Sequence, residues 1–202
     1  MSLPIGILAL QGAYQRHGAL LDRLGVRWRA VKTASALDDC MALILPGGES
    51  TSMTRLLEPD GLLERLRAFA QDRPLFGTCA GLILMGHNDD ARAASLGILD
   101  VQVARNAFGR QAQSFQARLD LDLDGEGADF PASFIRAPRI LAVGPGVEVR
   151  GRWNGEPVLV AQGAHLGMGF HPELSDDARI HAWWLRRLAA QAGNEDQTMA
   201  AS

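Results

Sequence analysis

Cys79 lies in the pattern Gly-x-Cys-x-Gly, between two short apolar runs. This is the pattern of a nucleophile elbow, in which a strand turns sharply into a helix and exposes one side chain at the turn. Gly77 and Gly81 suit such a turn, because it leaves no room for Cβ atoms beside the nucleophile. The dipole at the start of a helix favours a thiolate, and the backbone N–H of Ala80 could stabilise an oxyanion. The stretch therefore predicts a catalytic cysteine, with an inert cysteine in a buried strand as the alternative.

A histidine and a glutamate stand two positions apart in His171-Pro172-Glu173, directly after an apolar run. A residue before proline is held extended, and positions i and i+2 of an extended chain share a face. We therefore expect the carboxylate to orient the ring and stabilise its imidazolium, which with Cys79 makes a nucleophile, a base and an orienting group. The alternative is a surface turn that happens to contain both residues. The remaining histidines are expected to be ordinary surface or core residues: His17, His87, His165 and His181.

The segment Pro46-Gly47-Gly48-Glu49-Ser50 follows a continuously apolar run over residues 42–45. In open parallel sheets, ligands bind beyond the carboxyl ends of the strands, where this loop and the elbow would meet. Adjacent glycines let backbone N–H groups approach a reacting carbonyl, so Gly48 could complete an oxyanion hole with Ala80. The alternative is a glycine turn that caps a helix at Ser50, and both roles can coexist. No phosphate-loop pattern is present. Because no Cys/His cluster has zinc-type spacing, we expect no metal.

The composition limits the classes of function. Of 202 residues, 47% are hydrophobic and 21% charged, and the formal net charge of −3 gives no basic footprint for nucleic acid. No apolar run approaches the roughly 20 residues of a membrane helix, and no signal peptide is evident. With only two cysteines, Cys40 and Cys79, the sequence predicts a cytoplasmic protein without disulfides. We expect one domain over residues 1–192 and a disordered tail over residues 193–202.

Strands and helices alternate in the first half of the predicted structure. Buried apolar strands that alternate with helices indicate a parallel sheet covered on both faces. Strands are expected at 5–10, 26–31, 42–45 and before Cys79, with helices at 13–24, 51–57 and 62–71. The second half is richer in strands, which are expected at 98–103, 115–123, 133–136, 147–153, 158–162 and 166–170. A closing helix is expected to begin at Ser175, a good N-cap residue followed by two acidic residues.

Taken in order, the three motifs resemble those of the class I, triad-type glutamine amidotransferases. More narrowly, the chain looks like the glutaminase subunits of pyridoxal 5′-phosphate synthases. That narrower likeness is carried by Leu10-Gln11-Gly12, Arg105-Asn106-Ala107-Phe108-Gly109-Arg110-Gln111 and Phe134-Ile135-Arg136-Ala137-Pro138. It spans roughly residues 4–190, and departs from the family at Ala107, where a serine is common, and in the extended tail. The resemblance implies a flavodoxin-like three-layer α/β sandwich with a mostly parallel central sheet, helices on both faces and additional antiparallel strands.

The resemblance also implies an activity and a site. Glutamine would be hydrolysed to glutamate and ammonia, with Cys79 as nucleophile, His171 as acid and base, and Glu173 as its orienting group. The glutamine contacts would be Gly48, Glu49, Ser50, Arg105, Ile135 and Arg136. Arginine suits the α-carboxylate of free glutamine and a carboxylate suits its α-ammonium, although the sequence does not assign the pairs. No organic cofactor is expected.

The family's partner is a synthase subunit, which would receive the ammonia and build the vitamin B6 cofactor. The resemblance implies a large hetero-oligomer on a dodecameric synthase core. We expect the isolated chain to be a poor glutaminase until this partner binds, with Gly47-Gly48 as the switch and Gln11-Gly12 as the relay. Two rival functions are a hydrolase of another γ-glutamyl amide and a non-enzymatic module that senses oxidation or only binds a partner.

Overall fold

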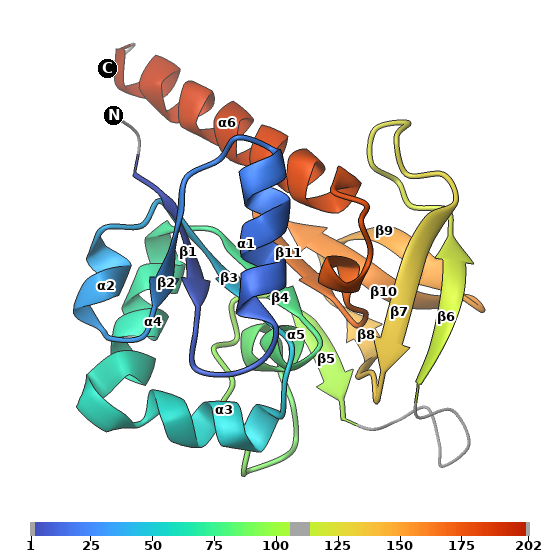
Figure 1. Cartoon of the computed structure of the whole chain (residues 1–202), viewed down its shortest axis with the longest axis horizontal. Helices are drawn as coiled ribbons and strands as arrows, with labels where there is room; N and C mark the ends of the chain where they lie inside the picture. Colours follow the sequence, from blue (N-terminus) through green and yellow to red (C-terminus); the bar gives the residue numbers. More distant parts are fainter. Residues whose placement is uncertain (1–2, 106–113, 201–202) are drawn as a thin grey trace.

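The computed structural model describes residues 3–105 and 114–200, with side chains as far as Gln191. Most of the motif that begins at Arg105, from Asn106 to Gln111, lies outside the described residues. Figure 1 shows a central sheet between two layers of helices, with two strand ribbons at one end. No helix in the described ranges is long and apolar enough to span a membrane.

The central sheet has seven strands in the order β2-β1-β3-β4-β11-β10-β9. The first five run parallel, and the last two pair antiparallel. This is the expected mostly parallel sheet with antiparallel strands added from the second half of the chain. The strand bounds are β1 Ile5–Leu8, β2 Trp28–Val31, β3 Ala42–Leu45, β4 Leu75–Thr78, β9 Glu148–Trp153, β10 Glu156–Gln162 and β11 His165–Met168.

Both faces of the sheet are covered, which explains why the central strands are apolar throughout. Ile5 and Ile7 pack in one buried cluster with residues of α1 (Tyr14–Arg23) and α6 (Arg179–Ala200). Leu8 points to the opposite cluster, which contains residues of the other helices. These are α2 (Ser35–Asp38), α3 (Ser50–Leu57), α4 (Leu62–Asp72) and α5 (Ala80–Met85), with the 3₁₀ turn η1 (Pro59–Gly61) between α3 and α4.

Two antiparallel ribbons complete the second half. β5 (Val101–Ala104) pairs with β8 (Arg139–Val143), and β6 (Ser114–Leu119) pairs with β7 (Phe130–Ile135). β8 was not predicted, because its outward positions Leu141 and Val143 are apolar and exposed, so the sequence lacks the usual alternation. The strand expected over 115–123 ends at Leu119, beyond which only an isolated bridge from Leu121 to Gly151 continues the pairing.

The closing helix differs from the prediction at both ends. Ser175 is not its N-cap: its hydroxyl donates to the carbonyl of Pro172, and α6 begins at Arg179, whose N–H donates to Asp177 Oδ1 at 3.0 Å. At the other end, α6 runs on to Ala200, where a disordered tail was expected from Gly193. Alanine, glutamate, glutamine and methionine are strong helix formers, and adding residues to a helix that packing already holds requires no new nucleation.

Candidate active site

Cys79 occupies the single residue between β4 and α5, as the elbow pattern predicts. Its backbone has φ 50° and ψ −101°, a region that residues other than glycine rarely adopt. Such a conformation costs on the order of 1–3 kcal/mol and persists only where the surroundings impose it. Here the N–H of Cys79 donates to the carbonyl of Met168 at 2.9 Å, and its carbonyl accepts from Ile83 in the first turn of α5. The strained turn presents the sulfur beyond the carboxyl end of the sheet.

The two glycines of the elbow are required by close packing. A Cβ on Gly77 would lie 2.7 Å from the backbone carbon of Gly81. A Cβ on Gly81 would lie 2.1 Å from the carbonyl oxygen of Leu45, at the end of β3. Both separations are shorter than real Cβ contacts, so the prediction that the turn leaves no room for these atoms is confirmed.

His171 and Glu173 form a buried pair, with His171 Nδ1 2.7 Å from Glu173 Oε1. The His171 N–H donates to the carbonyl of Ser133 on β7 at 2.9 Å, which anchors the segment after β11. The expected proximity is present, but its cause differs from the prediction. Residues Pro172–Leu174 form a 3₁₀ turn, η2, rather than an extended chain. This turn places the Glu173 carboxylate next to the His171 ring.

The surroundings favour opposite charges on these two side chains. Burial alone would lower the pKa of His171, but hydrogen bonds with Cys79 and Glu173 outweigh it and raise the pKa to about 10. Burial likewise opposes ionisation of Glu173, yet the hydrogen bond from His171 and the nearby rings lower the pKa of that carboxyl overall. At neutral pH the site therefore holds an imidazolium between the Cys79 sulfur and a carboxylate.

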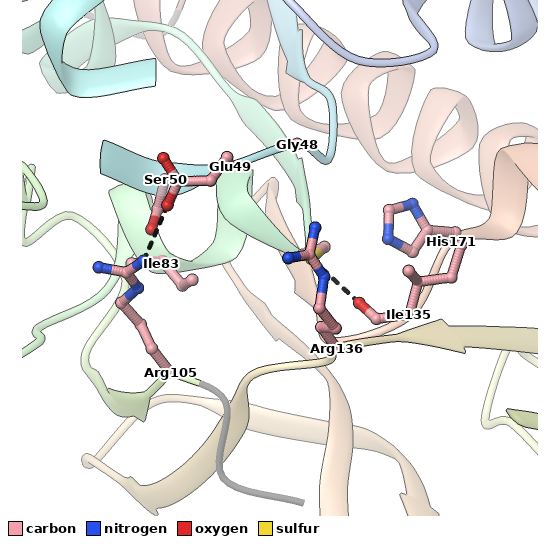
Figure 2. Close-up of a pocket in the computed structure, with 9 residues that line it drawn as sticks. Gly48, Glu49, Ser50, Ile83, Arg105, Ile135, Arg136 and His171 are labelled. Atoms are coloured by element: carbon pink, nitrogen blue, oxygen red, sulfur yellow. Dashed lines mark hydrogen bonds and ion pairs between the residues drawn. The ribbon is translucent and has the colours of Figure 1, made fainter. Parts of the chain in front are cut away.

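A cavity of about 150 Å³ opens over Cys79 (Figure 2). It is lined by Gly48, Glu49, Ser50, Cys79, Ile83, Arg105, Ile135, Arg136 and His171. All of these except Ile83 were predicted site residues. Ile83 lies one turn of α5 after Cys79, and its spacing from the nucleophile is the signal that could have identified it. Glu173 does not line the cavity because it stands behind His171.

Glu49 and Arg105 bring opposite charges together at the wall of this cavity. Arg105 Nη2 lies 2.8 Å from Glu49 Oε1, and the same guanidinium also pairs with Asp90. Glu49 is the N-cap of α3, where its carboxylate accepts from the N–H groups of Thr51 and Ser52. The hydrogen bond from the Thr51 hydroxyl is the main reason that the pKa of Glu49 falls to about 2.

Ser50 was considered as a helix cap, but that role belongs to Glu49. The buried hydroxyl of Ser50 has no hydrogen-bond partner among the described residues, although it lines the cavity. Its free hydroxyl is therefore available to a ligand.

Ile135, the last residue of β7, and Arg136, which follows it, line the opposite wall of the cavity. The Cys79 sulfur lies 4.0 Å from the carbonyl oxygen of Ile135. Arg136 has a positive φ of 42°, and Figure 2 shows its guanidinium pointing toward the loop that carries Gly48. A second strained residue thus directs its side chain into the same cavity.

The glycine loop is confined between the segment that follows β1 and His171. A Cβ on Gly47 would lie 2.3 Å from the His171 ring, and one on Gly48 would lie 2.7 Å from Gln11 Nε2. Gly12 has φ 74°, and a Cβ there would lie 2.0 Å from the carbonyl oxygen of Gly47. Gln11 Nε2 also donates to the carbonyl of Glu49 at 2.8 Å. Gln11 and Gly12 therefore lie against this loop, where a relay to it would have to be.

Two histidines with no predicted role lie behind the His171–Glu173 pair. His17 on α1 and His181 on α6 are both fully buried, and His17 Nε2 faces Glu173 Oε2 at 3.5 Å. The sequence signal for a role of His17 is weak: it is only that this residue falls on the apolar face of its helix. Across the described part of the chain, no group of three or more His, Cys, Asp or Glu side chains could hold a metal ion.

A strained cysteine elbow on an α/β sheet, beside a buried histidine–glutamate pair, defines the class of the triad-type cysteine hydrolases and amidotransferases. The sequence model of the SNO glutamine amidotransferase family matches residues 7–190, and the chain belongs to this family.

Known proteins of high similarity agree with this membership. The pyridoxal 5′-phosphate synthase subunit PdxT of Oenococcus oeni is 46% identical over 187 residues, 92% of this chain and 97% of the relative. The protein of the same name from Halalkalibacterium halodurans is 47% identical over 186 residues, covering 91% of this chain and 94% of that protein. A crystal structure described as a glutamine amidotransferase is 41% identical, with a TM-score of 0.85 over 92% of this chain and 98% of the other.

Proposed function

We propose that the chain is the glutaminase subunit of a pyridoxal 5′-phosphate synthase and hydrolyses L-glutamine with Cys79, His171 and Glu173. The observation that carries the proposal is the buried 2.7 Å pair of His171 and Glu173, set against a strained cysteine in the wall of a small cavity. The name of the relatives, which match nearly the whole chain, supports the subunit role. We assign the activity to a single domain over residues 1–192.

In the first half of the reaction, the Cys79 thiolate attacks the side-chain amide carbon of glutamine. The oxyanion that forms would be held by the N–H of Ala80 and the N–H of Gly48, and one such donor is worth roughly 3–4 kcal/mol. The His171 imidazolium donates its proton to the amide nitrogen as the C–N bond breaks. Ammonia leaves, and a thioester joins the side-chain carbonyl carbon of the glutamyl group, Cδ, to the sulfur of Cys79.

In the second half, His171 acts as a base. Forming the thioester removes the negative charge from the sulfur, and with it one of the two contacts that raise the pKa of His171. The neutral ring then takes a proton from water, whose hydroxide attacks the thioester and releases glutamate. The thiolate and the imidazolium are restored together, while Glu173 keeps its charge and holds the ring throughout.

The cavity wall suits the head group of a free amino acid. Glu49 and Arg105 present one negative and one positive group side by side, as the α-ammonium and α-carboxylate of glutamine require. We assign Gly48, Glu49, Ser50, Arg105, Ile135 and Arg136 to glutamine binding. A hydrolase of another γ-glutamyl amide would share Cys79 but would need room beyond the side-chain amide.

A synthase subunit is the partner that this reaction requires. Ammonia becomes ammonium in water and loses its nucleophilicity, so the acceptor site must be reached from Cys79 without passing through solvent. We propose that the chain docks on the synthase of a large hetero-oligomer and passes its ammonia directly to that subunit.

A glutamine analogue that alkylates thiols tests the assignment. We expect one label per chain, on Cys79, and protection by glutamine but not by glutamate diesters, which lack the free α-carboxylate. Cys40 is the internal control, because it is buried and its thiol donates to the carbonyl of Ala36 at 3.3 Å. Labelling of Cys40, or labelling of Cys79 without protection by glutamine, would overturn the assignment. Release of glutamate with a synthase present separates the enzyme from a non-enzymatic module.

A further inference from the structure

Glu173 uses only one of its two carboxylate oxygens on His171. The other, Oε2, is buried and faces Nε2 of His17 at 3.5 Å. Neither atom has a hydrogen-bond partner among the described residues. Two complementary polar atoms, both otherwise unsatisfied, thus face one another roughly half an ångström beyond a normal N–H···O distance. A small shift of either side chain completes the bond, and active-site hydrogen bonds commonly tighten once substrate binds.

His17 is in turn bonded to His181, with Nδ1 of His17 2.9 Å from Nε2 of His181. Burial lowers the pKa of both rings, to about 4 for His17, so each is neutral at pH 7 and carries one N–H. The bond between them requires one ring to donate and the other to accept. Only two arrangements of the protons satisfy this condition.

In the first arrangement, His181 Nε2–H donates to His17 Nδ1, and His17 Nε2–H points at the carboxylate of Glu173. In the second, His17 Nδ1–H donates to His181 Nε2, which turns the bare Nε2 of His17 toward the Glu173 oxygen. The second arrangement also leaves His181 Nδ1–H buried with no acceptor among the described residues. A buried donor without an acceptor bears its full desolvation cost, and two facing lone pairs add repulsion. The first arrangement is therefore the stable one.

We infer that His17 is a positioning residue for the active site: its Nε2–H holds the free oxygen of Glu173, and His181 fixes the His17 tautomer. The inference rests on the proposed role of the triad. With Oε2 held, the carboxylate cannot rotate away from His171 Nδ1, and its charge is kept in a buried site. The chain of contacts then runs from α6 through α1 to η2, and ends at Cys79.

The setting argues against a purely packing role for these rings. Both lie against Phe76, at ring-centre distances of 5.9 Å for His17 and 4.9 Å for His181, in a cluster that also contains Trp184. An apolar side chain would fill this region without the cost of burying ring nitrogens. The titratable groups that act on His17 are Glu173 and His171, while His17 and Arg23 act on His181.

Two substitutions of His17 separate positioning from packing. His17→Leu keeps the approximate volume but removes the donor, whereas His17→Gln keeps an N–H group near the position of Nε2. With glutamine and a stoichiometric synthase, we expect His17→Leu to lower kcat roughly tenfold or more, with KM changed less than twofold. We also expect the alkaline limb of kcat/KM to move to lower pH, because a less firmly held carboxylate supports the His171 charge less. His17→Gln should recover most of kcat.

His165→Gln is the matched control, since this half-buried ring lies at the other end of the parallel strands and accepts from the N–H of Leu75. Glutamine can keep that acceptor, so activity should equal that of the unsubstituted chain. If His17→Leu does not fold, ¹⁵N-histidine spectra of the unsubstituted chain decide the tautomers directly. Nε2–H on both His17 and His181 is expected, and Nδ1–H on both would overturn the inference.

Equal kcat values and pH profiles for His17→Leu and the unsubstituted chain would also overturn it, as would equal losses in the leucine and glutamine variants. An unsubstituted chain that releases no glutamate with a synthase present would instead refute the proposed function. The two failures are therefore distinguishable within one series of assays.

Discussion

The guanidinium of Arg105 lies 2.8 Å from the carboxylate that caps α3, that of Glu49. Arg105 directly follows β5 and Glu49 follows the glycine loop, and 56 positions separate them in the sequence. Their contact joins the antiparallel ribbon of β5 and β8 to the parallel sheet at the cavity wall. Because Glu49 also caps a helix, its carboxylate is held in place and Arg105 is held with it. We propose this pair as the preformed site for the zwitterionic head group of glutamine.

Arg105→Ala is expected to raise the KM for glutamine about tenfold or more, with a smaller change in kcat. The reason is that Arg105 is proposed to hold a part of glutamine that does not react, which makes its contribution similar in the ground state and the transition state. Steady-state kinetics with a synthase present measure both constants. Arg92→Ala is the control: Arg92 pairs with the same Asp90 but lies outside the cavity lining. A KM unchanged in Arg105→Ala would remove Arg105 from the glutamine site.

Substitutions of Cys79 should separate activity from stability. Cys79→Ala should abolish glutamine hydrolysis and keep the fold. Glutamate release by this variant at a rate within tenfold of the unsubstituted chain would contradict the assignment of Cys79 as the nucleophile. Cys79→Gly should abolish hydrolysis as well, yet raise the free energy of unfolding relative to Cys79→Ala by about 1 kcal/mol. Glycine adopts φ 50° without the steric cost that alanine pays. Chemical denaturation of the two variants measures the difference.

Glu173→Gln should lower kcat more than it changes KM, and should also alter the pH dependence. The imidazolium of His171 is stable up to about pH 10 because Cys79 and Glu173 favour its charge, despite its burial. A neutral amide removes the negative charge of Glu173, so the pKa of His171 falls and the active ion pair is lost at lower pH. The alkaline limb of kcat/KM, which reports the free enzyme, should therefore move toward neutral pH. Normal turnover with an unshifted limb would show that Glu173 is only structural.

The parts of the site that the sequence predicted are those in which neighbours along the chain determine the geometry. The strand-to-helix turn at Cys79 follows from a glycine on either side of it, and the His171–Glu173 pair follows from a spacing of two around a proline. Even there the local conformation was misassigned, because a 3₁₀ turn and an extended chain can both bring these two side chains together. The helix cap at Glu49 was assigned one residue too late, since serine is the more common N-cap.

The parts that were missed depend on contacts between distant segments. His17 and His181 are 164 positions apart and meet only because α1 and α6 pack on the same face of the sheet. No local pattern encodes that proximity, so each appeared to be an ordinary helical histidine. β8 was missed for a related reason: its strand character comes from pairing with β5, while its own sequence shows no alternation of polar and apolar residues.

The isolated chain should hydrolyse glutamine slowly, and a stoichiometric synthase should accelerate it. Ammonia made without an acceptor is lost as ammonium, and the glycine loop offers a means of control, because its peptides can reorient at low steric cost. If the resting loop misplaces one oxyanion donor, the resting rate should be about 10²–10³ below the activated rate. Glutamate release measured with and without the synthase tests this, and equal rates would refute gating while leaving the triad untouched.

Gly12→Ala should weaken that activation. Gly12 has φ 74°, and a Cβ there would lie 2.0 Å from the carbonyl oxygen of Gly47, so the added methyl must displace the peptide next to Gly48. The synthase-activated rate should therefore fall by about 10²–10³, to near the resting rate, if the N–H of Gly48 is the donor that is lost. Gly25→Ala is the matched control: its φ of 69° imposes similar backbone strain, but nothing lies within 4 Å of the added Cβ. A comparable loss in both variants would trace the effect to general destabilisation, whereas full activation of Gly12→Ala would exclude this contact from the switch.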